Sequence, residues 1–326
     1  MLRILHGTSV DFIKFWKRTT IITLAFILPA VVLIAVEGFH YSVEFTGGTL
    51  LQVAFHTPPH PDDLRSVVEQ AGVAGAEIQR FGTDTEYQIR AQDRAQVAEQ
   101  AAGANRISDV ISAALKAHFP ESKVVRTETV GPKVGGQLRQ QAALAVLFSF
   151  IITLAYLAWR FEWRFGLATI IATGHDLIAT LAFIKYMNLE ISLIVMAGIL
   201  TMIGYSMNDT IIIFDRVREN LKLYRKMSFR DVLNRSINEV LPRTVLTHGT
   251  VAVCLVALIL IAGEVIRPFA WVMLFGVVTG TFSSIYVASP ILLYVERRWP
   301  RPTGTKTGVA RTTSSSRERS TARETV

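Results

Sequence analysis

The sequence predicts a membrane α-helical bundle of six transmembrane helices with one extracytoplasmic ferredoxin-like α+β domain. Half of the 326 residues are hydrophobic and only 18% are charged, which is too little charge for the surface of a soluble protein of this length. The mean hydropathy is +0.35. Six apolar runs are each close to the ~20 residues that span a bilayer, and a polar segment at residues 38–137 follows the first run.

The first apolar run covers residues 19–36 and follows a leader, residues 1–18, which carries Lys14, Lys17 and Arg18. This charge pattern is typical of a transmembrane segment whose N-terminus stays in the cytoplasm. A cleaved signal peptide is the alternative, but the long leader and the poor cleavage site at residues 35–38 argue against it. The other five runs lie within residues 142–295, at 142–159, 167–187, 191–214, 244–262 and 271–295.

Basic residues collect on one side of the predicted bundle. The leader, the link at 160–164, the loop at 215–243 and the tail after residue 296 hold most of the 34 Lys and Arg residues. The opposite short loops hold mainly Lys185 and Arg267. The positive-inside rule therefore places both termini in the cytoplasm and residues 38–137 outside it. The net charge of +8 is then a mark of membrane orientation, and no nucleic-acid partner is expected.

The polar segment at 38–137 has the pattern of a small α+β domain. Strand-like stretches at 48–56, 76–83, 86–91 and 123–130 are interrupted by helical stretches at 61–72 and 93–119. The order βαββαβ predicts a ferredoxin-like sandwich.

Two cytoplasmic segments have their own patterns. The charged loop at 215–243 has helical periodicity in its apolar residues, which predicts an amphipathic helix lying at the membrane surface. The tail at 302–326 is rich in Ser, Thr and Arg with almost no large apolar residue, so we expect it to be disordered.

The fourth apolar run contains Asp209, and an ionisable residue inside a span is a functional candidate by default. The alternative is a solvated Asp209 at the helix end, but the apolar run continues through residues 211–214. Tyr205, Asn208 and Asp209 share one helical face, with Thr201 a turn earlier. Such a polar stripe must face other helices or a wet cavity.

Arg243 directly precedes the fifth run, and Thr247, Thr250 and Cys254 follow on the same helical face. From spacing alone, Arg243 is better explained as an anchor at the membrane surface than as a mechanistic residue. Cys254 is the only cysteine, so no disulfide can form within the chain.

The third run places Asp176 on one face with three threonines, and His175 lies beside it. From periodicity alone, local hydrogen bonding or helix packing explains this His-Asp pair better than a functional role. The three threonines are Thr169, Thr173 and Thr180.

Small residues have predicted packing and hinge roles. Gly276, Gly280 and Ser284 recur at four-residue spacing in the sixth run, which lets another helix approach closely. Glycines also mark both connections between the bundle and the external domain, and they supply the backbone freedom of a hinge. The residues of these connections are Phe45, Gly47, Gly48, Thr49, Gly131, Pro132 and Gly135.

The chain lacks the motifs of the commonest membrane enzymes. It has no Walker A loop, HExxH, GxSxG or Cys/His ligand cluster, which argues against an ATPase, a zinc protease or a serine hydrolase. We therefore expect neither enzyme activity nor a cofactor or metal.

Taken together, these motifs resemble the SecD/SecF family, a branch of the resistance-nodulation-division superfamily of proton-driven transporters, over residues 15–298. The strongest match is Gly204-Tyr205-Ser206-x-Asn208-Asp209-Thr210-x4-Asp215-Arg216-x-Arg218-Glu219-Asn220. Further matches are Phe45-x-Gly47-Gly48-Thr49, Val130-Gly131-Pro132-x-Val134-Gly135, His175-Asp176 and Arg243-Thr244-x2-Thr247. One external domain and six helices fit the separate SecF-type subunit and do not fit the fused two-part form.

The resemblance implies a role in protein export at the bacterial inner membrane, with the proton gradient as energy source. It implies that Asp209 and Arg243 take part in proton transport, with Asn208, Asp176 and Thr247 around them. It also implies a complex with SecD, association with the SecYEG channel and often YajC, and contact with exported unfolded polypeptides and membrane lipid. Many relatives have small hydroxyl residues where this chain has His248 and Gly249.

The leading hypothesis is an energy coupler in which protons moving inward past Asp209 and Arg243 drive motion of the external domains. We expect these two residues to face each other across the fourth and fifth helices. One alternative is a proton-driven half-transporter that exports a lipid or drug. Another is an intramembrane aspartyl protease that uses Asp176 and Asp209 as a dyad, although the Gly-x-Gly-Asp element of such proteases is replaced here by residues 206–209.

Overall fold

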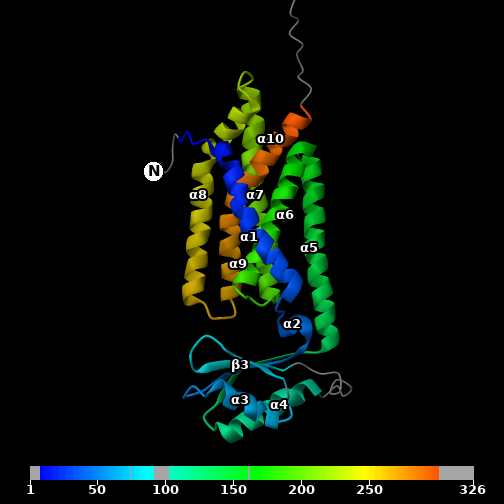
Figure 1. Ribbon diagram of the computed structural model, residues 1–326, viewed down its shortest axis with the longest axis vertical. Helices are drawn as coiled ribbons and strands as arrows, with labels where there is room; N and C mark the ends of the chain where they lie inside the picture. The colour runs from blue at the N-terminus through cyan, green and yellow to red at the C-terminus, as the bar shows by residue number, and fades with distance from the viewer. Residues whose placement is uncertain (1–7, 74, 92–102, 161, 301–326) are drawn as a thin grey trace, which may run out of the picture.

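The computed structural model describes residues 8–73, 75–91, 103–160 and 162–300. A bundle of long helices forms one part of the molecule, and a small domain of strands and helices lies at one end of it (Figure 1). The tail at 302–326 and residues 93–102 of the predicted helix at 93–119 lie outside the described residues.

Six helices of the described chain are long and apolar enough to cross a membrane, as the sequence predicts. The structure extends most of them beyond the apolar runs. The helices are α1 (Trp16–Glu37), α5 (Pro132–Arg160), α6 (Trp163–Tyr186), α7 (Leu193–Leu223), α8 (Phe229–Ile261) and a sixth formed by α9 (Arg267–Ser283), the π-helical turn η2 (Ser284–Ala288) and α10 (Ser289–Arg298).

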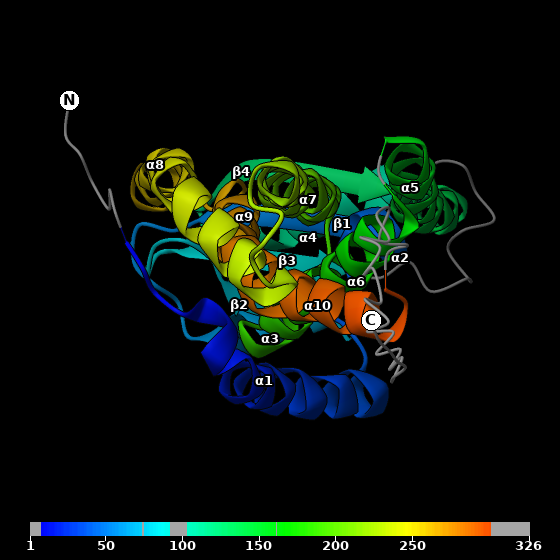
Figure 2. The same cartoon turned by 90° about the horizontal axis from the view of Figure 1, so that it is seen from above.

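The six helices are not equivalent in burial. The apolar stretches of α6, α7 and α9 are about half buried within the protein, whereas those of α1, α5 and α8 are largely exposed. Seen from above, α1, α5 and α8 lie on the outside of the bundle (Figure 2). The inner three helices therefore supply most of the interior of the bundle, and the outer three leave most of their apolar surface exposed.

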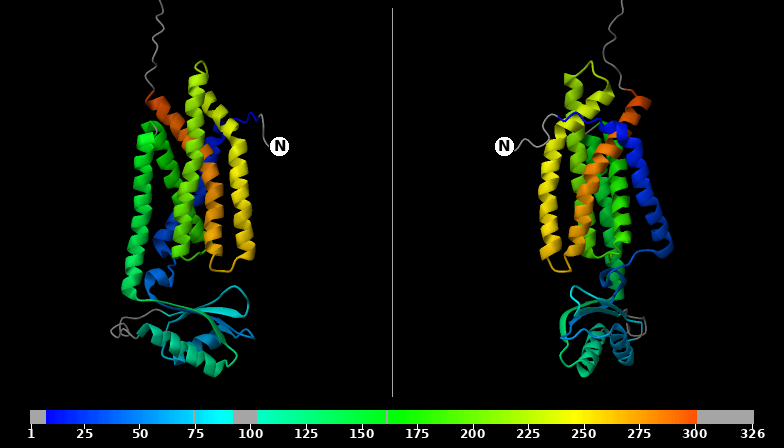
Figure 3. Two further views of the ribbon diagram at one scale, coloured as in Figure 1. Left: turned by 180° about the vertical axis from the view of Figure 1, so that it is seen from behind. Right: turned by 60° about the vertical axis from the view of Figure 1, so that its left-hand side comes forward.

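The loop at 215–243 contains the predicted amphipathic helix, but its apolar face packs on protein. The loop is a helical hairpin made by the ends of α7 and α8, which project together at the end of the bundle opposite the small domain (Figure 3). The connection is short, and Ser228 caps α8 by accepting a hydrogen bond from the Asp231 backbone N–H at 3.2 Å.

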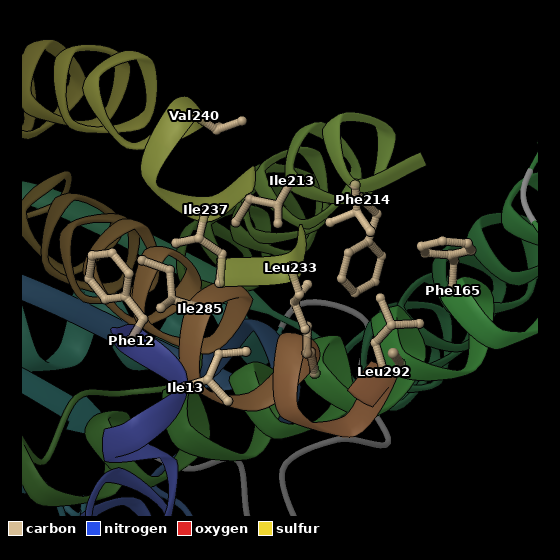
Figure 4. Close-up of a cluster of buried hydrophobic side chains, with 14 of the residues drawn as sticks. Phe12, Ile13, Phe165, Ile213, Phe214, Leu233, Ile237, Val240, Ile285 and Leu292 are labelled. Atoms are coloured by element: carbon tan, nitrogen blue, oxygen red, sulfur yellow. The ribbon is translucent and has the colours of Figure 1, made fainter. Parts of the chain in front are cut away.

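That apolar face belongs to a buried cluster at the end of the bundle that carries the hairpin. Leu233 and Ile237 of α8 pack with Phe214 of α7 and Phe165 of α6 (Figure 4). Phe12 and Ile13, from the short helix η1 (Phe12–Phe15), join the same cluster. Burial of these side chains accounts for the position of the hairpin and of the segment before α1.

In its described residues, the small domain has four strands and three helices. They are α2 (Val43–Thr46), β1 (Gly48–Ala54), α3 (Pro61–Gln70), β2 (Glu77–Arg80), β3 (Glu86–Ala91), α4 (Gly103–His118) and β4 (Lys123–Val130). Apart from the short α2, the order is the expected βαββαβ. The strand order in the sheet is β2-β3-β1-β4, and each neighbouring pair is antiparallel.

The sheet has one covered face and one face toward the bundle. Leu51, Val53 and Ile89 point to the side of α3 and α4, where they bury a core with Leu64 and Ile111. These two helices lie on the far side of the sheet from the bundle (Figure 1). Alternate residues along each strand must therefore point toward the bundle.

The connections between domain and bundle are tightly packed. Gly47 and Gly48 both have positive φ, 76° and 129°, a backbone conformation that favours glycine. A Cβ at Gly135 of α5 would lie 2.8 Å from the Gly47 backbone nitrogen. Phe45 is buried, and Thr49 lies 3.4 Å from Thr129 of β4 between their hydroxyl oxygens. The positive φ angles account for Gly47 and Gly48, and the close approach of α2 to α5 accounts for Gly135. Gly131 and Pro132 lie at the junction between β4 and α5.

Candidate functional site in the helix bundle

Asp209 lies inside the bundle, on the side of α7 that faces α8. Its side chain is only 3% exposed. The Thr244 hydroxyl donates a hydrogen bond to Asp209 Oδ1 at 3.1 Å, and His248 Nε2 lies 3.7 Å from the same oxygen. Asp209 Oδ2 is buried and has no hydrogen-bond partner among the described residues. The solvated alternative for Asp209 is therefore wrong for this structure.

The expectation that Asp209 and Arg243 face each other is wrong for this structure. Among the described residues, the ion pairs of Asp209 do not include Arg243. Arg243 is exposed, whereas its neighbour Thr244 is buried against Asp209. The reason is helical geometry: consecutive residues point about 100° apart, so the two side chains leave α8 on different faces.

Two further residues of the predicted site also lie on outer surfaces. Asn208 is exposed although it directly precedes the buried Asp209. Thr247 is exposed and donates to the Arg243 carbonyl at 2.9 Å. Together with Thr250 and Cys254, also exposed, Arg243 and Thr247 form a polar stripe on the outer face of α8.

Asp176 is the centre of a second buried polar cluster. It is fully buried on α6, and its Oδ2 accepts hydrogen bonds from the hydroxyls of Ser206 on α7 and Ser283 on α9, the latter at 2.5 Å. His175 Nδ1 lies 2.9 Å from the other oxygen, Oδ1. These contacts link three inner helices through one carboxyl group. The sequence pattern predicts local hydrogen bonding for the His175-Asp176 pair. The structure contains such a contact.

The two aspartates do not form a dyad. Asp176 is held by Ser206 and Ser283, and Asp209 by Thr244, so among the described residues each has its own partners. An aspartyl protease needs two carboxyl groups that share a proton. This arrangement gives no support to the protease alternative.

Small residues set the distance between α7 and the sixth span. A Cβ at Gly276 would overlap Met202 Cγ, and one at Gly280 would lie 2.9 Å from the Ser206 Cα. One turn further, the Ser284 and Thr210 hydroxyl oxygens are 2.7 Å apart. Both helices advance by four residues between these contacts. Gly276, Gly280 and Ser284 therefore all face α7, and their small size lets the two helices approach closely.

Sequence reasoning missed several residues of the site. Ser206, Ser283 and Thr281 are polar residues in apolar spans, and such residues could have signalled a polar interior. The π-helical turn at Ser284–Ala288 gives no such signal, although such turns are frequent at functional sites.

The chemistry open to this interior is the binding and release of protons. Asp209 can hold a proton on Oδ2, which has no hydrogen-bond partner among the described residues, and His248 Nε2 lies 3.7 Å from its other oxygen. In the described part of the chain, no group of three or more His, Cys, Asp or Glu residues is placed to hold a metal ion.

The comparisons with known proteins agree on one family. Residues 110–298 match the family described as "Protein export membrane protein SecD/SecF, C-terminal", and residues 32–59 match the "SecD/SecF GG Motif". The chain is 57% identical over 305 residues to the protein translocase subunit SecF of Gemmatimonas aurantiaca, covering 92% of this chain and 91% of that protein. It is 40% identical to SecF of Desulfurispirillum indicum, covering 87% and 92%.

Two solved structures have a similar fold. The crystal structure of SecDF from Thermus thermophilus, described as a translocon-associated membrane protein, matches with a TM-score of 0.80 and 32% identity. A SecDF structure in the super-membrane-facing form matches with a TM-score of 0.65 and 34% identity. The matches cover 91% and 90% of this chain but only 40% and 39% of the SecDF chains. With its six spanning helices and its glycine motif, this chain is therefore a multi-pass inner-membrane protein and belongs to the SecD/SecF family, among the relatives named SecF.

Proposed function

We propose that this chain is an accessory subunit of the Sec protein translocase, which works with SecD and uses the proton motive force to help exported polypeptides complete translocation. The observation that carries the proposal is the buried Asp209 in a spanning helix, with one oxygen free of hydrogen bonds among the described residues. A buried ionisable group of this kind marks a proton or ion pathway. The relatives named as translocase subunits favour this function over a lipid or drug half-transporter.

His248 is the proton partner of Asp209 in this proposal. Thr281 donates its own hydrogen to the Val277 carbonyl at 3.0 Å, so its oxygen is left to accept from His248 Nδ1. A neutral His248 then turns the lone pair of Nε2 toward the Asp209 carboxyl group. Two acceptors 3.7 Å apart repel unless a proton lies on one of them. The pair is therefore suited to hold one exchangeable proton.

The energy available from such a proton is sufficient for mechanical coupling. One charge that crosses a potential of 100 mV releases about 2.3 kcal/mol. A tenfold change in a two-state equilibrium requires about 1.4 kcal/mol. One proton per step can therefore bias the bundle between two arrangements by more than tenfold.

The orientation in the membrane follows from the charges and the fold together. The start of α1, the α7–α8 hairpin and the end of α10 lie at the same end of the bundle (Figure 1), and this end carries the basic residues. The sheet domain lies at the other end. The positive-inside rule then puts both termini in the cytoplasm and the sheet domain outside it.

SecD is the partner we assign to the outer face of α8. Arg243 and Thr247 are exposed there in the isolated chain, and a polar stripe facing hydrocarbon is costly. A second helix bundle would cover it, and the matched SecDF chains are long enough to contain one. The role of Arg243 in proton transport would then involve a group on SecD. Association with SecYEG and YajC rests on the family resemblance.

The external domain is proposed to be a ferredoxin-like domain that moves relative to the membrane. The βαββαβ order and the sheet order β2-β3-β1-β4 support the fold assignment. The two SecDF structures match nearly the same share of this chain, yet their TM-scores are 0.80 and 0.65. The matched parts of the two SecDF structures therefore differ in conformation, which supports motion of the domain relative to the bundle.

The test is Asp209→Asn, which keeps the size of the side chain and removes the titratable proton. We expect the variant to assemble with SecD in normal amounts and to lose the proton-driven part of protein export, down to the level of membranes without this subunit. Assembly and proton-driven export are measured in the same membrane vesicles. Normal export from a well-assembled Asp209→Asn protein would contradict the proposal.

Asp215→Asn is the matched control on the same helix. Asp215 is exposed and 3.7 Å from Arg218 in a surface ion pair, which contributes little to stability. Export should be unchanged in this variant. Poor assembly of Asp209→Asn alone would indicate a structural role instead, because it would mean that the buried carboxyl group and its hydrogen bond from Thr244 are needed to hold α7 and α8 together.

A further inference from the structure

A cleft of about 420 Å³ lies between the sheet of the external domain and the end of the bundle. Residues of the sheet form its roof. Its floor includes the apolar side chains of Leu189, Val265, Pro268 and Trp271, from the α6–α7 and α8–α9 connections and the start of α9. The volume is within the range of pockets that bind ligands in proteins.

The roof carries a row of amide side chains across the sheet. Gln79 of β2 pairs with Gln88 of β3, which pairs with Gln52 of β1, and Gln52 pairs with Arg126 of β4. Side chains in register on neighbouring strands point to the same face. All four residues line the cleft, so the row is directed toward the bundle.

The adjacent row of the sheet already has a structural role. Arg90 forms ion pairs with Glu77 of β2 and with Glu190 of the α6–α7 connection, and it is largely buried. This row fixes the domain to the bundle. In contrast, Gln79 and Gln88 have no side-chain hydrogen bond within the described residues, although Gln88 is only partly exposed. Their amides do not stabilise the fold.

Every charged side chain that lines the cleft already has a partner. Arg126 pairs with Glu128, Arg267 with Glu264, and Glu190 with Arg90. Glu44 accepts a hydrogen bond from the Leu193 backbone N–H at 2.6 Å. What remains for a ligand is the amides of Gln79 and Gln88 above, the apolar floor below, and the Arg267 Nε, which is buried without a hydrogen-bond partner among the described residues. The lining has four acidic and two basic side chains, so it fits a neutral hydrogen-bonding chain better than a lipid phosphate.

We propose that this cleft binds an extended segment of unfolded polypeptide through its backbone. The inference rests on the proposed function and adds the place of contact on this subunit. Each peptide unit offers one N–H and one C=O, and a Gln side chain can accept from the first and donate to the second. Such contacts ignore sequence, which suits a subunit that acts on many exported chains. Trp271 and its apolar neighbours receive the side chains.

The experiment places a photo-activated benzoylphenylalanine at Phe81, which lines the cleft, in vesicles that contain SecD and the channel. An exported chain arrested during translocation is the probe. We expect it to be cross-linked at Phe81. A second protein carries Gln79→Ala and Gln88→Ala as well; the loss of two neutral hydrogen bonds predicts roughly tenfold less cross-linking.

Gln70→Ala is the matched control, because Gln70 is an exposed amide at the end of α3, on the far layer of the same domain. It should leave the cross-link unchanged. The proposal is overturned if Phe81 cross-links only lipid or only this chain, or if the Gln79/Gln88 variant cross-links as well as the Gln70 control. If vesicles without this subunit export equally well, the proposed function itself fails, which is a separate result.

Discussion

At the scale of single residues, the position of Asp209 depends on its neighbours on α8. Thr244 is its hydrogen-bond donor, and Arg243, one residue earlier, is on an exposed face. Asp209 has one carboxyl oxygen without a hydrogen-bond partner among the described residues, whereas both oxygens of Asp176 have partners, from two serines and His175. We infer that Asp209 carries the transported proton and that Asp176 joins the inner helices.

Thr244→Val should therefore reduce proton-driven export several-fold. The change keeps the shape of the side chain and removes the hydroxyl group, which leaves a buried carboxyl oxygen without its donor, at a cost of about 1–3 kcal/mol. Thr247→Val is the control, because Thr247 is exposed and bonds only to its own helix. Initial rates of export at a fixed proton gradient would measure both. An equal loss in the two variants would mean that the outer face of α8 matters as much as the buried one.

Sequence reasoning identified Asp209 as a buried candidate but not its surroundings. Hydropathy is sufficient to find an ionisable residue in an apolar run, because the residue and the run around it are both visible in the sequence. Its partners depend on how α7, α8 and α9 are rotated against each other. That rotation is set by packing of residues such as Gly280 and Ser206, which a single sequence does not reveal. The expected Arg243 contact failed for this reason.

At the scale of elements, the close contact of α7 with the sixth span is the structural basis of the site. Gly276 and Gly280 bring the two helices together, and Ser283 and Ser284 then reach Asp176 and Thr210. The small-residue spacing was visible in the sequence. The hairpin of α7 and α8 was not visible in the sequence. Its apolar periodicity fits a helix that packs on protein as well as a helix that lies on a membrane surface.

Gly280→Ala should destabilise the bundle. The added Cβ would lie 2.9 Å from the Cα of Ser206, a backbone atom that cannot move aside, and overpacking of this kind costs about 1–3 kcal/mol. We expect a lower midpoint of thermal unfolding in detergent and weaker export. Gly249→Ala is the control, since nothing lies within 4 Å of its new Cβ. If Gly280→Ala were as stable as Gly249→Ala, close packing would not explain the glycine.

At the scale of the whole molecule, the domain contacts the bundle at separate places around the cleft. One is the close approach of Gly135 to Gly47, and another is the ion pair of Arg90 with Glu190. The β2–β3 turn forms a third, because a Cβ at Gly82 would lie 3.0 Å from Glu264 Cγ in the α8–α9 connection. Motion of the domain would keep the covalent connections near Gly47 and Gly135 and separate the other contacts.

A disulfide between cysteines at positions 82 and 264 should therefore stop export. The protein carries Gly82→Cys, Glu264→Cys and Cys254→Ala, and the bond would hold the β2–β3 turn against the bundle. We expect proton-driven export to fall under oxidation and to recover on reduction, while assembly with SecD stays constant. The fraction of cross-linked protein and the export rate are measured in the same vesicles.

The single-cysteine proteins are the controls for this lock. Gly82 has a φ of 74°, which an L-residue adopts with strain, and Glu264→Cys removes the partner of Arg267. Each single variant measures one of these costs without a bond. A loss of export that appears in the single variants, or that persists after reduction, would come from strain. Unchanged export by the fully cross-linked protein would mean that this contact does not open during the cycle, and that force reaches the exported chain by another part of the complex.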